Sequence, residues 1–151
     1  MPKLALTTFL PYRLVSVADQ VSRLISCIYT EQFNLTRPEW RILASLEELG
    51  STSATDICAH STQDKMTVSR AVSGLEAKGF LRRHDNPQDR RNKQLELTPA
   101  GHALYQQIVP LILEREACLL TNFSADEQAT LMQLLGKLQD RSAALTHPSK
   151  P

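Results

Sequence analysis

The residues with the clearest chemical potential in this sequence are basic side chains around a short run of turn formers. The run is Asp85-Asn86-Pro87-Gln88-Asp89, and Arg90 and Arg91 follow it directly. An arginine at the tip of a β-hairpin suits the narrow, negatively charged minor groove of A·T-rich DNA. We expect the Asp89 carboxylate to orient a neighbouring arginine through a charge-assisted hydrogen bond. An exposed turn that only aids solubility is the alternative interpretation.

The positive charge of the chain is concentrated in its middle. The 151 residues carry a formal net charge of +1, but residues 63–93 contain eight basic and four acidic side chains. That segment therefore carries +4, and the rest of the chain carries −3. A local excess of this kind predicts an anionic partner, although a solvated basic face would have the same composition.

A helix predicted over about 63–78 offers this partner a polar face. On a helical wheel, the side expected to pack inward contains Val68, Ala71, Val72 and Leu75. The opposite side contains Gln63, Met66, Thr67, Arg70 and Ser73. Arg70 can bind a guanine edge with two hydrogen bonds or contact a phosphate. Without the neighbouring elements, an ordinary amphipathic surface helix would show the same pattern.

The other predicted elements are those needed to hold such a helix in place. In chain order, the sequence predicts helices over about 11–32, between Thr36 and Gly50, over 54–59 and over 63–78, strands over 80–84 and 93–97, and helices after Thr98 and Ser124. Thr36 and Glu39 form a capping box, and Thr62 is the expected cap of helix 63–78. The fold class is mainly α with a small β-hairpin wing, which is a winged helix-turn-helix.

This architecture has a direct physical relation to DNA. A major groove about 12 Å wide admits one helix. The short helix before it sets its angle, and the hairpin lies where it can reach a neighbouring minor groove or phosphates. The predicted partner is therefore double-stranded DNA.

Several other classes of protein and site are not indicated. There is no phosphate-cradling glycine-rich loop and no nucleophile elbow, so we expect no enzyme activity and no cofactor. The four histidines have no metal-site spacing, and the three cysteines form no disulfide framework. There is no run of 18 apolar residues, and the start is too short and polar for a signal peptide. We therefore expect a cytoplasmic protein without metal or membrane contact.

The sequence resembles the MarR (multiple antibiotic resistance regulator) family over nearly its whole length. The wing signature is carried by residues 85–91 followed by Leu95-Glu96-Leu97-Thr98-Pro99-Ala100-Gly101. The recognition helix and its exit are carried by Thr67-Val68-Ser69-Arg70 and Leu75-Glu76-Ala77-Lys78-Gly79-Phe80-Leu81. Met66 differs from the small or polar residue that family members often have there.

The resemblance implies a homodimer that binds a pseudo-palindromic DNA site. Within one domain of residues 1–151, it assigns 36–98 to a winged helix-turn-helix lobe, and 9–33 and 99–146 to a helical dimerisation region. It makes Arg90 the wing-tip arginine and Asp89 its partner. The residues then expected to contact DNA are Gln63, Lys65, Thr67, Ser69, Arg70, Arg90 and Arg91.

The resemblance also implies an effector. Residues 10–14 and 38–41 resemble a subgroup that responds to aromatic carboxylic acids or their thioesters, so the chain is predicted to be a repressor released by such a compound. An aromatic wall and a cation suit an aromatic carboxylate. The candidate effector residues are Tyr12, Arg13, Ser16 and Trp40. Core packing would explain Trp40 equally well, and a surface ion pair would explain Arg13.

Two alternative functions stay open at this point. The chain could sense oxidants through Cys27, Cys58 or Cys118, which requires an exposed thiolate near a cation. It could instead be a winged-helix protein-interaction module that does not read DNA. Such a module would not need to concentrate positive charge on one helix and one hairpin.

Overall fold

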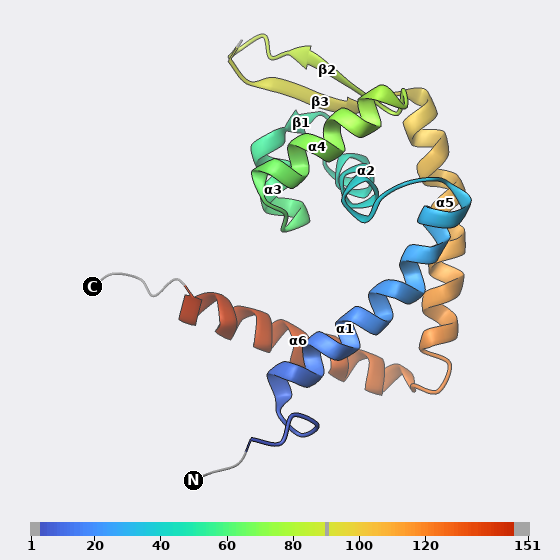
Figure 1. The fold of residues 1–151 in the computed structure, drawn as a ribbon, viewed down its shortest axis with the longest axis vertical. Helices are drawn as coiled ribbons and strands as arrows, with labels where there is room; N and C mark the ends of the chain where they lie inside the picture. The colour runs from blue at the N-terminus through green and yellow to red at the C-terminus, as the bar shows by residue number, and fades with distance from the viewer. Residues whose placement is uncertain (1–3, 90, 147–151) are drawn as a thin grey trace. The chain divides into compact units, whose positions relative to one another are not determined.

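The computed structural model describes residues 4–89 and 91–146, and it confirms the predicted class of a mainly helical protein with a small hairpin wing (Figure 1). The elements are α1 Leu10–Cys27, the π-helical turn η1 Ile28–Gln32, α2 Arg37–Leu49, β1 Thr52–Ser53, α3 Ala54–Ser61, α4 Lys65–Ala77, β2 Leu81–Asp85, β3 Lys93–Leu97, α5 Pro99–Leu119 and α6 Ala125–Thr146.

The chain divides into two compact units, Met1–Leu113 and Glu114–Pro151, with the boundary inside α5. Within the described ranges, no helix is long and apolar enough to cross a membrane.

The sheet contains the predicted hairpin and one strand that no pattern predicted. β2 and β3 pair antiparallel, with Leu81 opposite Leu97 and Asp85 opposite Lys93. β1 pairs with the other edge of β3, which gives the order β1-β3-β2. A strand of two residues is too short to show alternation, so the sequence could not reveal it.

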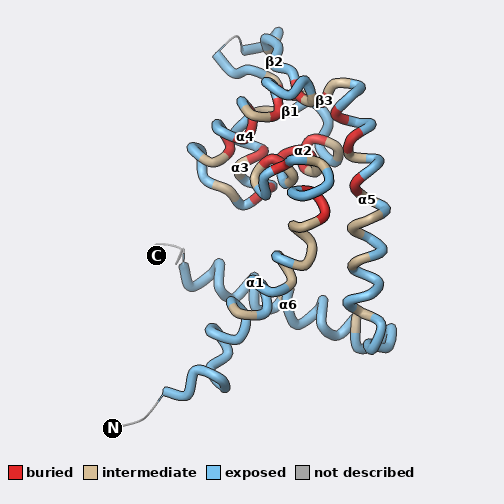
Figure 2. Tube along the Cα trace, turned by 45° about the vertical axis from the view of Figure 1, so that its right-hand side comes forward, coloured by how far each residue is buried: buried red, intermediate tan, exposed pale blue. Residues whose placement is uncertain are grey.

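The hydrophobic core lies in the first unit, between α2, α3, α4, the sheet and the start of α5. Figure 2 shows the buried segments gathered in this lobe. The inward face predicted for helix 63–78 is confirmed, because Val68, Ala71, Val72 and Leu75 are all buried. Burying a valine or leucine side chain stabilises the fold by about 1.5–3 kcal/mol. The opposite face of α4 is therefore left to solvent by packing alone.

The predicted start of the recognition helix was wrong by two residues. α4 begins at Lys65, and Asp64 is its N-cap, because an Asp64 carboxylate oxygen accepts the Thr67 backbone N–H at 2.9 Å. Thr62 instead ends α3 in the left-handed conformation, with φ of 53°. A carboxylate is the stronger cap here because it also interacts with the positive end of the helix dipole.

The first two helices largely follow the sequence. The predicted helix 11–32 is α-helical to Cys27 and continues as the π-helical turn η1. The predicted capping box of α2 is confirmed. The Thr36 hydroxyl accepts the Glu39 backbone N–H at 3.3 Å, and the Glu39 carboxylate accepts the Thr36 backbone N–H at 2.8 Å.

Apolar side chains remain exposed on a helix of each unit. In α1 of the first unit, they include Leu10, Leu14 and Val17. In α6 of the second unit, they include Leu131, Leu134, Leu135, Leu138 and Leu145. Contiguous exposed apolar surface marks an interaction site in soluble proteins.

Candidate nucleic-acid interface

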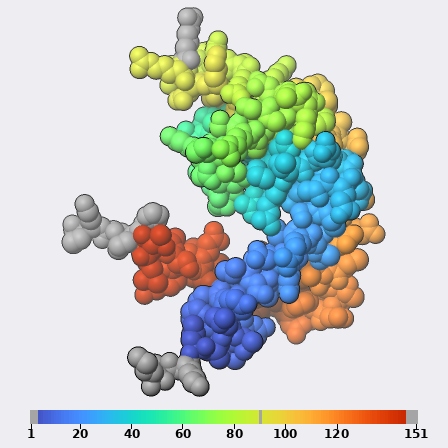
Figure 3. Space-filling model, viewed as in Figure 1, coloured from blue at the N-terminus to red at the C-terminus, as the bar shows by residue number. Residues whose placement is uncertain are grey.

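The exposed face of α4 presents the polar and basic side chains predicted for it. Lys65, Ser69 and Arg70 are exposed, and Met66 between them is 65% exposed. In the space-filling view, α4 and the hairpin form one continuous surface (Figure 3). The inward packing of Val68, Ala71, Val72 and Leu75 turns this polar face toward solvent.

Two predicted contact residues at the start of α4 are partly withdrawn from solvent. The Thr67 hydroxyl donates to Asp64 at 2.7 Å, and the Gln63 side-chain nitrogen is buried without a hydrogen-bond partner. The pKa of the Asp64 carboxyl lies below its usual value. The main cause is the hydrogen bond from the Thr67 backbone N–H, and the second is the hydrogen bond from the Thr67 hydroxyl. These contacts make the turn before α4 a structural cap as well as a candidate contact region.

Four of the eight basic residues in the segment 63–93 already have acidic partners. Across the hairpin, Arg82 pairs with Glu96 and Lys93 pairs with Asp85. The remaining two pairs are Arg83–Glu76 at 3.0 Å and Lys78–Glu39 at 2.8 Å. The Lys93 hydrogen bond is the main reason that the pKa of Asp85 is lowered.

The basic residues that keep their charge available are therefore fewer than the sequence count. Among the described residues of this segment, those without an acidic partner are Lys65, Arg70 and Arg91. All three belong to the predicted contact set. Two of the four ion pairs could have been found from the predicted hairpin. Arg82 lies directly opposite Glu96, and Asp85 directly opposite Lys93, in the strand register.

The side chains of Asp89 and Asn86 accept hydrogen bonds that stabilise the wing turn. Asp89 accepts the backbone N–H of Arg91 at 3.0 Å and the side-chain N–H of Asn92 at 3.2 Å. The Asn86 side chain accepts the Gln88 backbone N–H at 3.0 Å. Arg90 lies outside the described residues, so its predicted pairing with Asp89 stays a prediction.

The base of the wing is fastened to the recognition helix and to α5. Arg83 in β2 donates to Ser73 and Glu76 of α4, at 3.0 Å each. The Thr98 hydroxyl donates to the Gly79 carbonyl at 2.6 Å and accepts the Gly101 backbone N–H at 3.1 Å. A Cβ atom at Gly101 would lie 2.1 Å from the Phe80 carbonyl oxygen, so this close approach requires glycine. These contacts fix the wing relative to α4.

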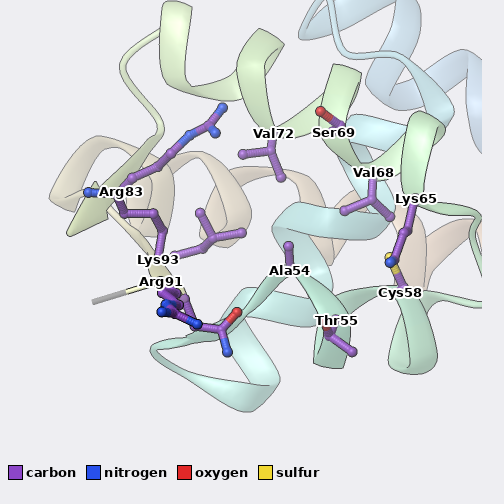
Figure 4. Close-up of a pocket in the computed structure, with 12 residues that line it drawn as sticks. Ala54, Thr55, Cys58, Lys65, Val68, Ser69, Val72, Arg83, Arg91 and Lys93 are labelled. Atoms are coloured by element: carbon purple, nitrogen blue, oxygen red, sulfur yellow. The ribbon is translucent and has the colours of Figure 1, made fainter. Parts of the chain in front are cut away.

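A hollow of about 350 Å³ separates α3, α4 and the hairpin (Figure 4). Its lining includes the cations Lys65, Arg83, Arg91 and Lys93, together with the Cys58 thiol. The hollow lies on the surface that carries the candidate DNA contacts, and of its four cations Arg83 and Lys93 have acidic partners. Within the described residues, no three His, Cys, Asp or Glu side chains are placed to hold a metal ion.

A second hollow, of about 360 Å³, lies beside α1 and α2. Trp40 lines it and stacks between Tyr29 and Tyr105, with ring centroids 5.7 and 5.9 Å away. The other lining residues are Ala18, Val21, Ser22, Ile25, Tyr29, Arg37 and Arg41. The hollow therefore combines an aromatic wall with two guanidinium groups.

Only one of the four predicted effector residues lines this hollow. Tyr12, Arg13 and Ser16 lie further toward the start of α1, where Tyr12 and Arg13 are exposed and Ser16 is half-buried. The sequence reasoning missed Arg37 and Arg41, which lie three residues before and one residue after Trp40. Their spacing around Trp40 on α2 was the available signal.

The three cysteines have different surroundings. The Cys27 thiol is half-buried and donates to the Leu24 carbonyl at 3.1 Å. Cys58 is half-buried and lines the cationic hollow, and Cys118 is exposed in the second unit. Cys58 is thus the cysteine nearest to the candidate DNA-binding surface among the described residues.

Comparison with known proteins gives a consistent result. The MarR family model matches residues 35–93. The HTH-type transcriptional regulator PecS of Dickeya dadantii is 30% identical over 135 residues, covering 85% of this chain and 81% of PecS. The structure of a mutant Escherichia coli MarR complexed with operator DNA has a TM-score of 0.80 at 27% identity, covering 91% of this chain and 99% of that one. NadR in complex with 4-hydroxyphenylacetate has a TM-score of 0.75 at 24% identity, covering 91% and 97%.

Proposed function

This chain belongs to the MarR family of transcription regulators, and from that membership we propose that it is a repressor that binds operator DNA as a homodimer and is released by an aromatic acid. Members of the family are transcription regulators rather than enzymes. The observation that carries the proposal is the position of Lys65, Arg70 and Arg91, whose charges have no acidic partner among the described residues.

The proposed DNA contacts divide between two grooves. The exposed half of α4 enters the major groove, where Arg70 reads a guanine edge or a phosphate, and Lys65 and Ser69 contact the backbone. We propose that Arg91 contacts a phosphate and that Arg90, which lies outside the described residues, enters the adjacent minor groove. Gln63, just before α4, and Thr67, in its first turn, contact DNA only after their side chains turn outward.

The exposed apolar faces support a homodimer. α1 leaves Leu10, Leu14 and Val17 in solvent, and α6 leaves five leucines exposed in its own unit. Interfaces of obligate homodimers are more hydrophobic than ordinary surface. Sedimentation equilibrium should therefore give twice the chain mass of 16.9 kDa.

The hollow beside Trp40 is the proposed effector site. Trp40 and Tyr29 supply an aromatic wall for the ring of the effector, and Arg37 and Arg41 can pair with its carboxylate. A NadR structure of the same fold contains 4-hydroxyphenylacetate, an aromatic acid, which guides the choice of test compounds. Salicylate, 4-hydroxyphenylacetate and an aromatic thioester are suitable probes.

The test of DNA reading is selection of an operator from random duplexes, followed by affinity measurement across a range of salt concentrations. We expect a steep fall of affinity with salt, because bound cations release counterions from the phosphates. Arg70→Ala should weaken binding strongly. Arg82→Ala, which removes a cation already paired with Glu96, is the matched control. If no duplex is selected, the protein-interaction alternative replaces this proposal.

The test of release is a thermal-shift series with the probes, read beside operator affinity. A ligand that binds only the native state raises the melting temperature by mass action. We expect at least one aromatic acid to raise the melting temperature and weaken operator binding. Release by peroxide but by none of the probes would favour redox sensing, and Cys58→Ser would then test the cysteine at the DNA-binding surface.

A further inference from the structure

A buried carboxylate joins the start of α2 to the end of the recognition helix. The Glu39 side chain is only 7% exposed, and one of its oxygens accepts the Lys78 ammonium and the Thr36 backbone N–H, each at 2.8 Å. The same ammonium donates to the Asn34 carbonyl at 2.8 Å. Only the carboxylate is buried, because the Lys78 side chain is 31% exposed. Removing Lys78 would leave the buried Glu39 charge uncompensated, so the ammonium helps to hold the carboxylate in place.

A glycine in the middle of α4 allows this contact. A Cβ atom at Gly74 would lie 2.3 Å from the second Glu39 oxygen. Glycine is unfavourable inside a helix, where alanine is the best helix former. Gly74 therefore lets α4 approach α2 closely enough for Lys78 to reach Glu39.

The next residue along α2 faces the proposed effector hollow. Trp40 lines that hollow and stacks between Tyr29 and Tyr105, while Glu39 contacts α4. In the first turn of α2, Trp40 therefore lines the candidate ligand site, and its neighbour Glu39 contacts the recognition helix.

The other two acidic residues of α2 that form ion pairs contact α3 and α5. Among the described residues, Glu48 pairs with His60 of α3 at 3.1 Å, and Glu47 pairs with His102 of α5 at 2.6 Å. The Glu39–Lys78 pair is the ion pair that α2 makes with α4, and Glu39 is the most buried of the three carboxylates. This difference singles it out as the charged connection between the hollow and the DNA-binding surface.

We propose that Glu39 and Lys78 are positioning residues that couple the hollow beside Trp40 to the recognition helix. The inference rests on the proposed function, in which α4 reads DNA and the hollow takes an aromatic acid. Occupation of the hollow displaces the first turn of α2, and the ion pair transmits this displacement to α4. Coupling is reciprocal, so DNA bound by α4 also alters the surroundings of Trp40.

Trp40 is the single tryptophan of the chain, so its fluorescence reports on the hollow without a label. The experiment titrates the full-length protein with its selected operator and follows DNA binding by anisotropy and Trp40 emission in parallel. We expect operator binding to change the emission of the wild type. In Glu39→Gln and Gly74→Ala, operator should still bind, but the emission change should fall below half.

The variants separate coupling from folding. Gly74→Ala keeps both charges and displaces only the flexible end of the Glu39 side chain, so it tests the contact if Glu39→Gln fails to fold. Glu48→Gln is the matched control, with the same substitution on the same helix but a partner in α3. It should keep the full emission change. An unchanged emission response in the folded variants, or no response in the wild type, overturns the inference.

A second arm adds salicylate as the probe. Quenching of Trp40 measures occupation of the hollow, and operator affinity measures release. In the wild type we expect affinity to fall by about tenfold, within the usual range of allosteric coupling. In Gly74→Ala, quenching should persist while the fall shrinks to less than about twofold. If salicylate and the other probes leave Trp40 unquenched, the proposed effector role fails, and the operator titration still decides the coupling.

Discussion

The two halves of the recognition helix α4 differ in what surrounds them. The N-terminal half exposes Lys65, Met66 and Arg70, and its two cations have no acidic partner among the described residues. The C-terminal half is fastened on two sides. Lys78, the residue that ends the helix, pairs with Glu39 of α2, and Glu76 pairs with Arg83 of the wing.

Under the proposed function, this difference lets one helix serve both recognition and positioning. Groups that must meet a partner are left unpaired in solvent, where their hydrogen-bond donors stay available. Groups that must set the helix angle are buried or paired within the fold. The basic composition of the segment 63–93 therefore overstates the charge available to DNA, because half of it maintains the structure.

The largest expected effect is on stability, and it compares a buried residue of α4 with an exposed one. Leu75→Ala, in the C-terminal half, should lower the free energy of unfolding by about 2–5 kcal/mol, because Leu75 is fully buried and its loss leaves a cavity. Met66→Ala should change it by less than about 0.5 kcal/mol, because Met66 is 65% exposed. Urea unfolding of both variants measures the difference. Similar losses of unfolding free energy in the two variants would contradict the distinction between the packed and the exposed half of α4.

A smaller effect should separate unpaired from paired arginines. Arg70→Ala should weaken operator binding by about 1–3 kcal/mol and reduce the salt slope by about 1 if the contact is to phosphate. Arg83→Ala should weaken it less, because Arg83 already pairs with Glu76 and Ser73. Fluorescence anisotropy at matched salt compares the variants, and circular dichroism checks that both stay folded. Equal losses would show that pairing within the fold does not predict the contribution to binding.

The wing extends the comparison beyond α4. Arg90→Ala should weaken specific binding by about 1–3 kcal/mol if this side chain enters the minor groove. The loss should be greatest for operators with A·T pairs at the outer positions, where the minor groove is narrow. Competition between operators that differ only there provides the measurement. Unchanged binding at matched salt would remove Arg90 from the contact set.

The smallest effect concerns the cap of the recognition helix. The pKa of Asp64 is lowered in the folded state by its hydrogen bonds to Thr67, so its contribution to stability is present above its unfolded pKa and is lost as pH falls through the folded value. Asp64→Asn keeps a capping oxygen but has no charge. The melting temperature of the wild type should exceed that of the variant at neutral pH, and the gap should close at acidic pH. A gap independent of pH would exclude the carboxylate charge as its cause.

Much of the fold follows from short-range patterns. The inward face of α4 and the capping box of Thr36 and Glu39 were predicted because each depends on residues of one helix and its cap. The hairpin was predicted because a short run of turn formers joins its two strands. The helix start at Lys65 was missed because Thr62 and Asp64 are both good caps. Their choice depends on Thr62 ending α3, which the local sequence does not determine.

The sequence by itself determined most of the elements, their apolar faces and the set of basic residues from which the proposed DNA contacts are drawn. Only the tertiary structure decided which cations remain available and which residues line the hollow. Lys78 meets a carboxylate 39 positions away, and Trp40 stacks with rings from η1 and α5. Helix caps and strand alternation are set by covalent spacing, whereas ion pairs and cavities depend on distances that exist only after the elements have packed.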